Sequence, residues 1–316
     1  MKIIRHPAST GLPIPAAITL GHFDGVHLGH QYILKKVVAK ARALGVSSVV
    51  ILFEPQANEY FALQQNRSIP ARLTRFREKM QEIEKQGIDI ILCLRFNQEM
   101  ANLSATEFLQ DIIFHYFEVQ HWVVGDDFHF GADRKGDYDF LKEIACDQSF
   151  TLERVATFEL NGMRISSTAV REALKAANLP LVEQYLGRPY GLVGRVAQGH
   201  QRGRIIGFPT ANIHLLRRTS PVLGVFVVGI KGIGNRVLKG VANIGQRPTV
   251  SGARVLLEVH IFDFDQIIYG HYLEVDFIHK LRDEKKFESL DALKEQILLD
   301  AKEARAFPIH LTEPRP

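Results

Sequence analysis

Short apolar runs alternate with longer segments of helical spacing over residues 16–170. The apolar runs at 16–20, 49–53, 88–94 and 122–124 are typical of buried strands. Between them, segments 32–44, 72–86 and 105–115 have helical spacing, and Gly45 and Gly87 end the first two. This order predicts a parallel sheet with helices on both faces, which binds ligands beyond the carboxyl ends of its strands.

The sequence changes character after residue 186, where Gly187, Pro189 and Gly191 indicate a linker. Apolar runs at 192–197, 225–231, 236–243, 255–262 and 273–278 alternate with glycine-rich turns, which predicts a small antiparallel barrel. Ser289 is expected to cap a closing helix. A length of 316 residues suits two domains, and we expect them at 1–186 and 187–316.

Composition limits the class of protein, the cellular compartment and the partners that we expect for this chain. With 46% hydrophobic and 23% charged residues it should fold, and no apolar run approaches the roughly 20 residues that span a bilayer. The only two cysteines, Cys93 and Cys146, form no CxxC pair and fit a reducing compartment better than a disulfide framework. Together with the lack of a bilayer-spanning run, this leads us to expect a cytoplasmic protein without a membrane partner. The net charge of +4 favours anions in general, but without a block of five like charges we expect no nucleic-acid partner.

The stretch GHFDGVHLGH, residues 21–30, follows the first predicted strand directly. Its glycines allow the backbone to approach a ligand closely. If a helix begins near Leu28, its first amide groups and its positive dipole end face the same place as His27 and His30. The sequence therefore predicts a phosphate-binding site at this turn.

Other interpretations of this turn are weaker. A lone histidine is usually structural, but two at this spacing on a glycine-rich turn favour a ligand site. Catalytic zinc needs three protein ligands, and the chain has no HExxH or CxxC companion, so we assign no metal to these histidines. No GxGxxG occurs, and the stretch from Gly131 to Gly136 differs from a P-loop because Asp137 stands where lysine is required.

HxGH at a strand-to-helix turn resembles the signature of the nucleotidyltransferase superfamily, whose members transfer a nucleotide from ATP and release pyrophosphate. The stretch ISSTAVR, residues 165–171, resembles the second phosphate clamp of that superfamily. Ser167 or Thr168 is suited to cap a helix whose amides meet phosphate, and Arg171 lies on the same face. Standing alone, this pattern is more often a plain helix cap.

The predicted barrel contains a second candidate site. Thr210 and Asn212, in GFPTAN, offer two oxygen ligands on one side of an extended segment, which suits Mg²⁺ carried by a nucleotide. In the strand at 255–262, alternation places Glu258 on the face opposite Leu257 and Val259. Such a glutamate normally faces solvent, but beside Mg·ATP it becomes a candidate base for phosphoryl transfer.

Eight motifs in this order resemble the bacterial bifunctional riboflavin kinase/FAD synthetase family: GHFDGVHLGH, GDDFHFGADRKGD, ISSTAVR, LGRPY, GFPTANI, GVANIGQRPTV, EVHIFDF and LRDEKKF. The resemblance implies a nucleotidyltransferase-type α/β domain followed by a riboflavin kinase β-barrel with a C-terminal helix. The barrel would phosphorylate riboflavin to FMN, releasing ADP. The α/β domain would adenylylate FMN to FAD, releasing pyrophosphate. Each step would use ATP and Mg²⁺.

The resemblance also implies roles for individual residues. His27 and His30 would bind ATP phosphates during adenylyl transfer, together with Arg171. The rest of that nucleotide and flavin site would comprise Gly21, Phe23, Asp24, Gly25, Gly29, Asp127, Phe128, Ser167 and Thr168. Glu258 would activate the ribityl hydroxyl of riboflavin. The kinase site would further include Gly207, Pro209, Thr210 and Asn212, the last two holding Mg²⁺, with Arg282 near the flavin.

The sequence departs from the family pattern after the second strand. Gln56 and Ala57 replace His-Pro, and His129 stands where arginine is common. One alternative is therefore a riboflavin kinase with weak or lost FAD synthetase activity. Another is an RNA-binding barrel, which requires an exposed aromatic stripe for which Phe262 and Phe264 are the candidates.

Overall fold

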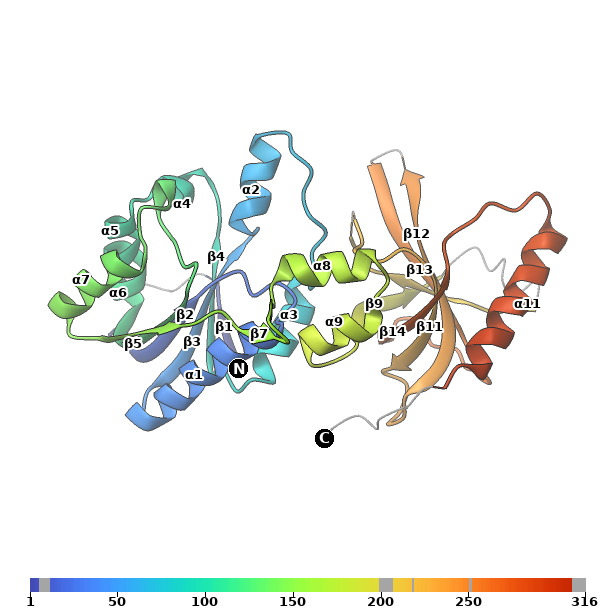
Figure 1. Ribbon diagram of the computed structural model, residues 1–316, viewed down its shortest axis with the longest axis horizontal. Helices are drawn as coiled ribbons and strands as arrows, with labels where there is room; N and C mark the ends of the chain where they lie inside the picture. The colour runs from blue at the N-terminus through green and yellow to red at the C-terminus, as the bar shows by residue number, and fades with distance from the viewer. Residues whose placement is uncertain (6–11, 199–206, 218, 250–251, 309–316) are drawn as a thin grey trace. The chain divides into compact units, whose positions relative to one another are not determined.

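The computed structural model describes residues 1–5, 12–198, 207–217, 219–249 and 252–308. The chain divides into two compact units, one formed by residues 1–70 and 74–167 and the other by 71–73 and 168–316 (Figure 1). Within the described ranges, no helix is long and apolar enough to cross a membrane. Each unit is described by itself below.

A six-stranded parallel sheet forms the centre of the first unit, which confirms the predicted α/β fold. Its order is β1 (Lys2–Ile4), β4 (Ile90–Arg95), β3 (Ser47–Glu54), β2 (Ile14–Leu20), β5 (Phe117–Gly125), β6 (Thr151–Val155). The chain winds outward from β2 through β3 to β4 and then resumes on the other side of β2 with β5. The winding direction reverses between β2 and β5, where open α/β sheets bind ligands.

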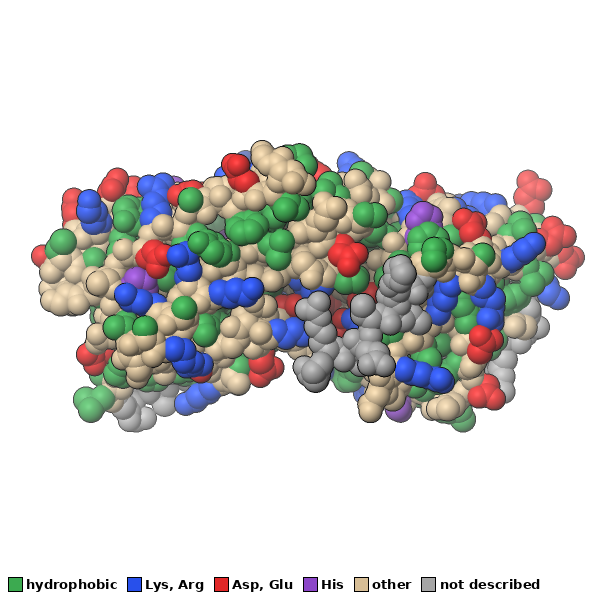
Figure 2. Space-filling view, turned by 60° about the horizontal axis from the view of Figure 1, so that its bottom comes forward, with side chains coloured by type: hydrophobic (Ala, Val, Ile, Leu, Met, Phe, Trp, Pro, Cys, Tyr) green, Lys and Arg blue, Asp and Glu red, His purple; other side chains and the backbone are tan. Residues whose placement is uncertain are grey.

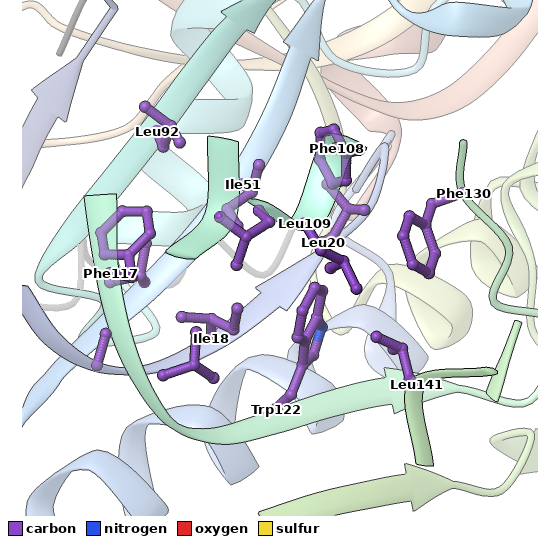
Figure 3. Packing of buried hydrophobic residues seen from close by; sticks show 14 of the residues in the cluster. Ile18, Leu20, Ile51, Leu92, Phe108, Leu109, Phe117, Trp122, Phe130 and Leu141 are labelled. Carbon is purple, nitrogen blue, oxygen red and sulfur yellow. The ribbon is translucent and has the colours of Figure 1, made fainter. Parts of the chain in front are cut away.

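Helices cover both faces of this sheet. On one face, α1 (Leu28–Leu44) and α3 (Phe76–Glu84) pack against side chains that include Val50 and Ile91. On the other lie α5 (Ala105–Glu107), a π-helix (Phe108–Ile113), α6 (Phe114–Tyr116) and α7 (Tyr138–Gln148). Trp122 is fully buried in that second core, among Ile18, Leu20 and Leu141 (Figure 3). Three shorter elements and a hairpin complete the unit: α2 (Ala57–Gln64), α4 (Gln98–Asn102), a 3-10 turn (Ala132–Arg134), and β7 (Glu159–Leu160) with β8 (Met163–Arg164).

Helix α3 begins later than the spacing of apolar residues predicts. The predicted start is residue 72, whereas the helix starts at Phe76 with Arg75 as its N-cap. The preceding Thr74 donates from its backbone N–H and its hydroxyl to Asp24 Oδ1, so a contact with a turn about fifty residues earlier in the chain fixes its position. Residues 71–73 are counted with the second unit. These tertiary contacts override the local pattern.

The second unit is a closed antiparallel barrel followed by a helix, as predicted. Its strand order is β10 (Ala211–His214), β13 (Gly252–Ile261), β12 (Leu238–Thr249), β11 (Gly224–Lys231), β14 (Tyr272–Arg282), β9 (Tyr190–Ala197). The helices among its described residues are α8 (Ser167–Lys175), whose first residue is counted with the first unit, α9 (Leu179–Leu186) and α11 (Leu290–Ala306). Ser289 caps α11 by accepting from the Ala292 N–H, and Ala301 and Ala304 pack against Val225 and Val227 of the barrel.

Candidate active sites

A cavity of about 730 Å³ opens at the carboxyl ends of β2 and β5 in the first unit. Polar side chains line part of its wall, among them His27, His30, Arg134, Arg164, Ser166 and Ser167. Aromatic side chains also line it, among them Phe53, Phe61, Phe96, Phe108 and Phe128. Cavities of this size and mixed character bind organic ligands of nucleotide size.

The turn that carries the histidines has a strained backbone. Phe23 and Val26 have φ of 47° and 43°, and Gly25 between them has φ of 81°. A positive φ in a β-branched residue such as valine is uncommon and costs about 1–3 kcal/mol. The Phe23 and Val26 side chains are 2% and 0% exposed, so packing in the core holds this conformation. Strain of this kind is typical of ligand-binding turns.

Thr74 holds the middle of the turn. Its N–H donates to Asp24 Oδ1 at 3.0 Å, and its hydroxyl accepts from the Gly25 N–H at 2.9 Å. The Asp24 carbonyl also accepts from Ser167 Oγ at 2.9 Å. Asp24 is only 2% exposed, so its carboxylate serves to fix the turn. Sequence reasoning missed Thr74, because no local motif connects it to a turn about fifty residues earlier.

Two further side chains hold the ends of the turn. Lys79 Nζ donates to the His22 carbonyl at 2.6 Å, and Gln31 Nε2 donates to the Val26 carbonyl at 2.9 Å. Both bonds are partly buried, and a backbone carbonyl that is shielded from water and left without a partner costs as much as a lost hydrogen bond. Side chains from α1 and α3 therefore supply the partners that regular secondary structure cannot supply here.

The two histidines form a stacked pair at the start of α1. Their ring centroids lie 3.6 Å apart at an interplanar angle of 18°. His27 is the N-cap, and its Nδ1 accepts from the His30 N–H at 3.3 Å, which leaves Nε2 as the donor of a neutral His27 ring. Desolvation by burial lowers the pKa of His30 well below 6.5, helped by the charges of His27, Lys79 and His22. His30 is therefore neutral at neutral pH.

The structure brings most residues predicted for the first site into one cavity. Those lining it are Gly21, Phe23, His27, Gly29, His30, Asp127, Phe128 and Ser167. Asp24 and Gly25 do not line it and instead bind Thr74 behind the wall. Thr168 and Arg171 are counted with the second unit, where Arg171 Nε donates to the Ala71 carbonyl at 2.8 Å.

Two arginines of the cavity wall were not predicted as site residues. Arg164 lies on the hairpin of β7 and β8, and its Nη2 is 2.5 Å from Asp127 Oδ2. Arg134 Nη2 lies 3.2 Å from His129 Nδ1. The guanidinium group of Arg134 therefore places a positive charge beside position 129, where the family often has arginine. The hairpin had a sequence signal: Asn161 and Gly162 both have positive φ, as an Asn-Gly turn requires.

Gln56, which departs from the family pattern, lies outside the cavity wall. It is 2% exposed and is the N-cap of α2, where its N–H donates to Glu59 Oε2 at 3.1 Å. Its neighbour Ala57 does line the cavity. The changed side chain at position 56 therefore acts on the position of α2 more directly than on a ligand.

The second candidate site is a row of polar residues across three barrel strands. Glu258 of β13 lies opposite Asn212 of β10 on one side and opposite Asn243 of β12 on the other. Residues directly opposite on antiparallel strands point to the same face. Leu257 and Val259, the neighbours of Glu258 along β13, are 0% exposed in the barrel interior. Because side chains alternate along a strand, the row that contains Glu258 lies on the outer face. Asn243 was not predicted; its Nδ2 donates to Glu284 Oε1 at 3.3 Å.

The segment that leads into β10 is fixed by His260. Its Nδ1 lies 2.8 Å from the Pro209 carbonyl, and its ring contacts Phe208 with centroids 5.4 Å apart. Thr210 follows Pro209, and Gly207 at the start of the segment has φ of 85°. The residues His200 to Arg204, which precede this segment in the sequence, lie outside the described residues.

The remaining predicted residue of the barrel, Arg282, is held in an ion pair. Its Nε and Nη2 donate to the Asp300 carboxylate, at 2.9 Å to Oδ1 and 2.6 Å to Oδ2.

The RNA-binding alternative loses one of its two aromatic candidates, because Phe262 is 7% exposed and packs against α11. On the face drawn in Figure 2, basic and acidic side chains are intermixed over both units.

Comparison with known proteins agrees with this geometry. A family model for FAD synthetase matches residues 11–169, and one for riboflavin kinase matches residues 186–308. A bifunctional riboflavin kinase/FMN adenylyltransferase of Escherichia coli K12 is 45% identical over 316 residues, covering 99% of this chain and 100% of the relative. Another, from Pseudomonas fluorescens, is 48% identical over 289 residues and 91% of each chain.

A solved structure of similar architecture is described as a macrolide-efflux protein from Streptococcus pneumoniae. It has a TM-score of 0.81 and 31% identity, and the match covers 98% of this chain and 100% of that one. The two family models together span both units, and the kinase-only alternative gains no support because the FAD synthetase match runs through residues 56 and 57. The chain belongs to the family of bifunctional riboflavin kinase/FMN adenylyltransferases.

Proposed function

We propose that this chain converts riboflavin to FAD in two steps, each of which consumes ATP. The barrel transfers the γ-phosphoryl group of ATP to riboflavin, giving FMN and ADP. The α/β unit transfers the adenylyl group of a second ATP to FMN, giving FAD and pyrophosphate. The observation that carries this proposal is the cavity with a histidine pair at one part of its wall and an aromatic surface at another. An exposed free thiol, Cys146, supports a reducing cytoplasmic location.

For adenylyl transfer, the FMN phosphate oxygen attacks the α-phosphorus of ATP, and the bond from that phosphorus to the leaving pyrophosphate breaks. The reaction needs no protein nucleophile, because alignment and stabilisation of phosphate charge supply the catalysis. His27 and His30 donate hydrogen bonds to phosphate oxygens, together with the first amides of α1. Arg164 and Arg134 add positive charge at the same wall, and the aromatic surface accepts the flavin ring.

For phosphoryl transfer, Glu258 takes the proton of the ribityl hydroxyl as its oxygen attacks the γ-phosphorus, and ADP leaves. The register places Asn212 and Asn243 on either side of Glu258, so the base stands within a row of polar groups. Thr210 and Asn212 are oxygen donors of the kind that Mg²⁺ prefers, and they would hold it with the nucleotide. When bound, Mg²⁺ supplies positive charge that offsets the negative charge of the phosphates.

Incubation of the purified chain with riboflavin and Mg·ATP tests this function, with flavins resolved by chromatography. FMN should appear first and FAD second, with one ADP released per riboflavin phosphorylated and one pyrophosphate per FAD. Accumulation of FMN without FAD would instead establish the kinase-only alternative. If riboflavin remained unchanged and added FMN were not adenylylated, neither activity would belong to this chain.

A further inference from the structure

Lys79 is a buried lysine behind the wall of the adenylyl-transfer cavity. Its side chain projects from α3 and is 2% exposed, although lysine is almost never fully buried unless it is paired. It is not among the residues that line the cavity. Burial of an ammonium group is costly, so its place here calls for a specific bonding role.

One bonding partner of Lys79, the His22 carbonyl, marks the start of the strained turn. The sheet ladder ends at Gly21, whose N–H donates to the Ile51 carbonyl at 3.2 Å. One residue later, the His22 carbonyl accepts from Lys79 Nζ at 2.6 Å, and the backbone then takes a positive φ at Phe23. Lys79 thus binds the backbone at the point where regular strand bonding stops and strain begins.

We propose that Lys79 is a positioning residue for adenylyl transfer: it fixes the His22 carbonyl and thereby the strained turn that presents His27 and His30 to ATP. This inference rests on the proposed function of the α/β unit. Groups held a fraction of an ångström from their productive position lose much of their catalytic effect, and a 1 Å displacement costs roughly a hundredfold in rate. A residue outside the cavity therefore affects the rate through the turn.

The charge of Lys79 also acts on His30 and on His22. Desolvation is the largest cause that lowers the pKa of His30, and the charges of His27, Lys79 and His22 lower it further. Desolvation and Lys79 also lower the pKa of His22, helped by Arg134 and opposed by Asp24 and Glu59. Removing the Lys79 charge should raise the pKa of His30 toward its ordinary value. That change distinguishes Lys79 from a residue that only packs.

The test compares Lys79→Met, which keeps most of the buried stem, with Lys85→Met, which removes the same charge from the exposed end of α3. Both activities are measured separately, as riboflavin to FMN and as added FMN to FAD. The pKa of His30 is followed by NMR. Lys79→Met should lower kcat for FAD synthesis about 10- to 100-fold and raise the pKa of His30. Riboflavin phosphorylation should stay within about twofold of the wild type, and Lys85→Met should behave as the wild type in every assay.

Wild-type FAD synthesis by Lys79→Met, or an unchanged His30 titration, overturns the inference while the proposed function stands. If that variant does not fold, FAD synthesis and the pKa of His30 are measured in Lys79→Gln instead, because glutamine keeps a donor for the His22 carbonyl without the charge. FAD synthesis should then fall less, while the pKa of His30 still rises. An unsubstituted chain that made no FAD from FMN would overturn the proposed function and this inference together.

Discussion

His27 Nδ1 accepts a hydrogen bond from the backbone N–H of His30 at 3.3 Å, while the two rings stack with centroids 3.6 Å apart. His27 therefore serves both as the cap of α1 and as a wall of the cavity. Capping requires an acceptor on a short side chain, whereas binding of phosphate oxygens requires a donor. Substitutions can separate these two roles.

His27→Asn should keep the cap and lose the ring donor. Asparagine is among the preferred N-cap residues, so the free energy of unfolding should change by less than about 0.5 kcal/mol. His27→Ala should lose about 1 kcal/mol. Both variants should lose about a hundredfold in FAD synthesis, because neither supplies the imidazole N–H, and both should phosphorylate riboflavin normally. FAD synthesis near the wild-type rate in His27→Asn would show that only the cap matters.

Thr74→Val should weaken the turn without changing the shape of the side chain. The hydroxyl donates to Asp24 and accepts from Gly25, so its loss removes two buried hydrogen bonds and costs about 1–3 kcal/mol. Thr74→Ser keeps both bonds and is the matched control. Chemical denaturation gives the stability, and conversion of added FMN gives the rate. Equal stability and equal FAD synthesis in the two variants would exclude this role for the hydroxyl.

Asp300→Asn should impair the kinase unit alone. Asp300 is 5% exposed and accepts hydrogen bonds from both Nε and Nη2 of Arg282, which we expect near the flavin. Loss of this charged acceptor should cost about 1–3 kcal/mol and slow the formation of FMN. Glu295→Gln, which removes an exposed charge from the same helix, is the control. A change in the FMN-to-FAD rate, with FMN formation intact, would contradict this assignment.

Asp276 should make stability depend on pH. Burial raises its pKa from 3.8 to about 6, although Lys231, 2.6 Å away, pulls the pKa down. Because the folded chain binds this proton more tightly than the unfolded chain, the stability it contributes is complete below pH 3.8 and is lost as the pH rises through about 6.

Asp276→Asn cannot titrate, so it isolates this effect. The free energy of unfolding of the wild type relative to this variant should fall between pH 4 and pH 6, by at most about 1.4 kcal/mol per pH unit. Denaturant titrations at several pH values measure it. A difference between the two proteins that stayed constant over this range would rule out Asp276 as the titrating group.

Apolar periodicity located four of the six strands of the sheet and five of the six strands of the barrel, because strands buried by packing need apolar side chains. The two sheet strands that it missed, β1 and β6, lie at the edges of the sheet. It missed β10, a four-residue strand that exists because it pairs with β13 and β9. It also missed α2, where Glu59 is the only fully buried residue of the helix. Such short elements are stabilised by their neighbours in space, and their own sequences carry little signal.

Motifs located the histidine turn and the row at Glu258, but not the residues that hold them. Lys79 and Thr74 bind the turn from about fifty residues further along the chain. Asn243 joins Glu258 only through the register of β12 and β13. A single sequence records none of these pairings, because each depends on how separate segments meet in the fold.

The central claim is that one chain carries two separable sites. It is tested most directly by assaying Glu258→Gln, His30→Ala and an equal mixture of the two with riboflavin and Mg·ATP. Glu258→Gln alone should make no FMN yet convert added FMN to FAD, and His30→Ala alone should accumulate FMN. The mixture should make FAD from riboflavin, because each variant supplies the step that the other lacks. If both folded variants lost both activities and the mixture made no FAD, the two-site account would be wrong.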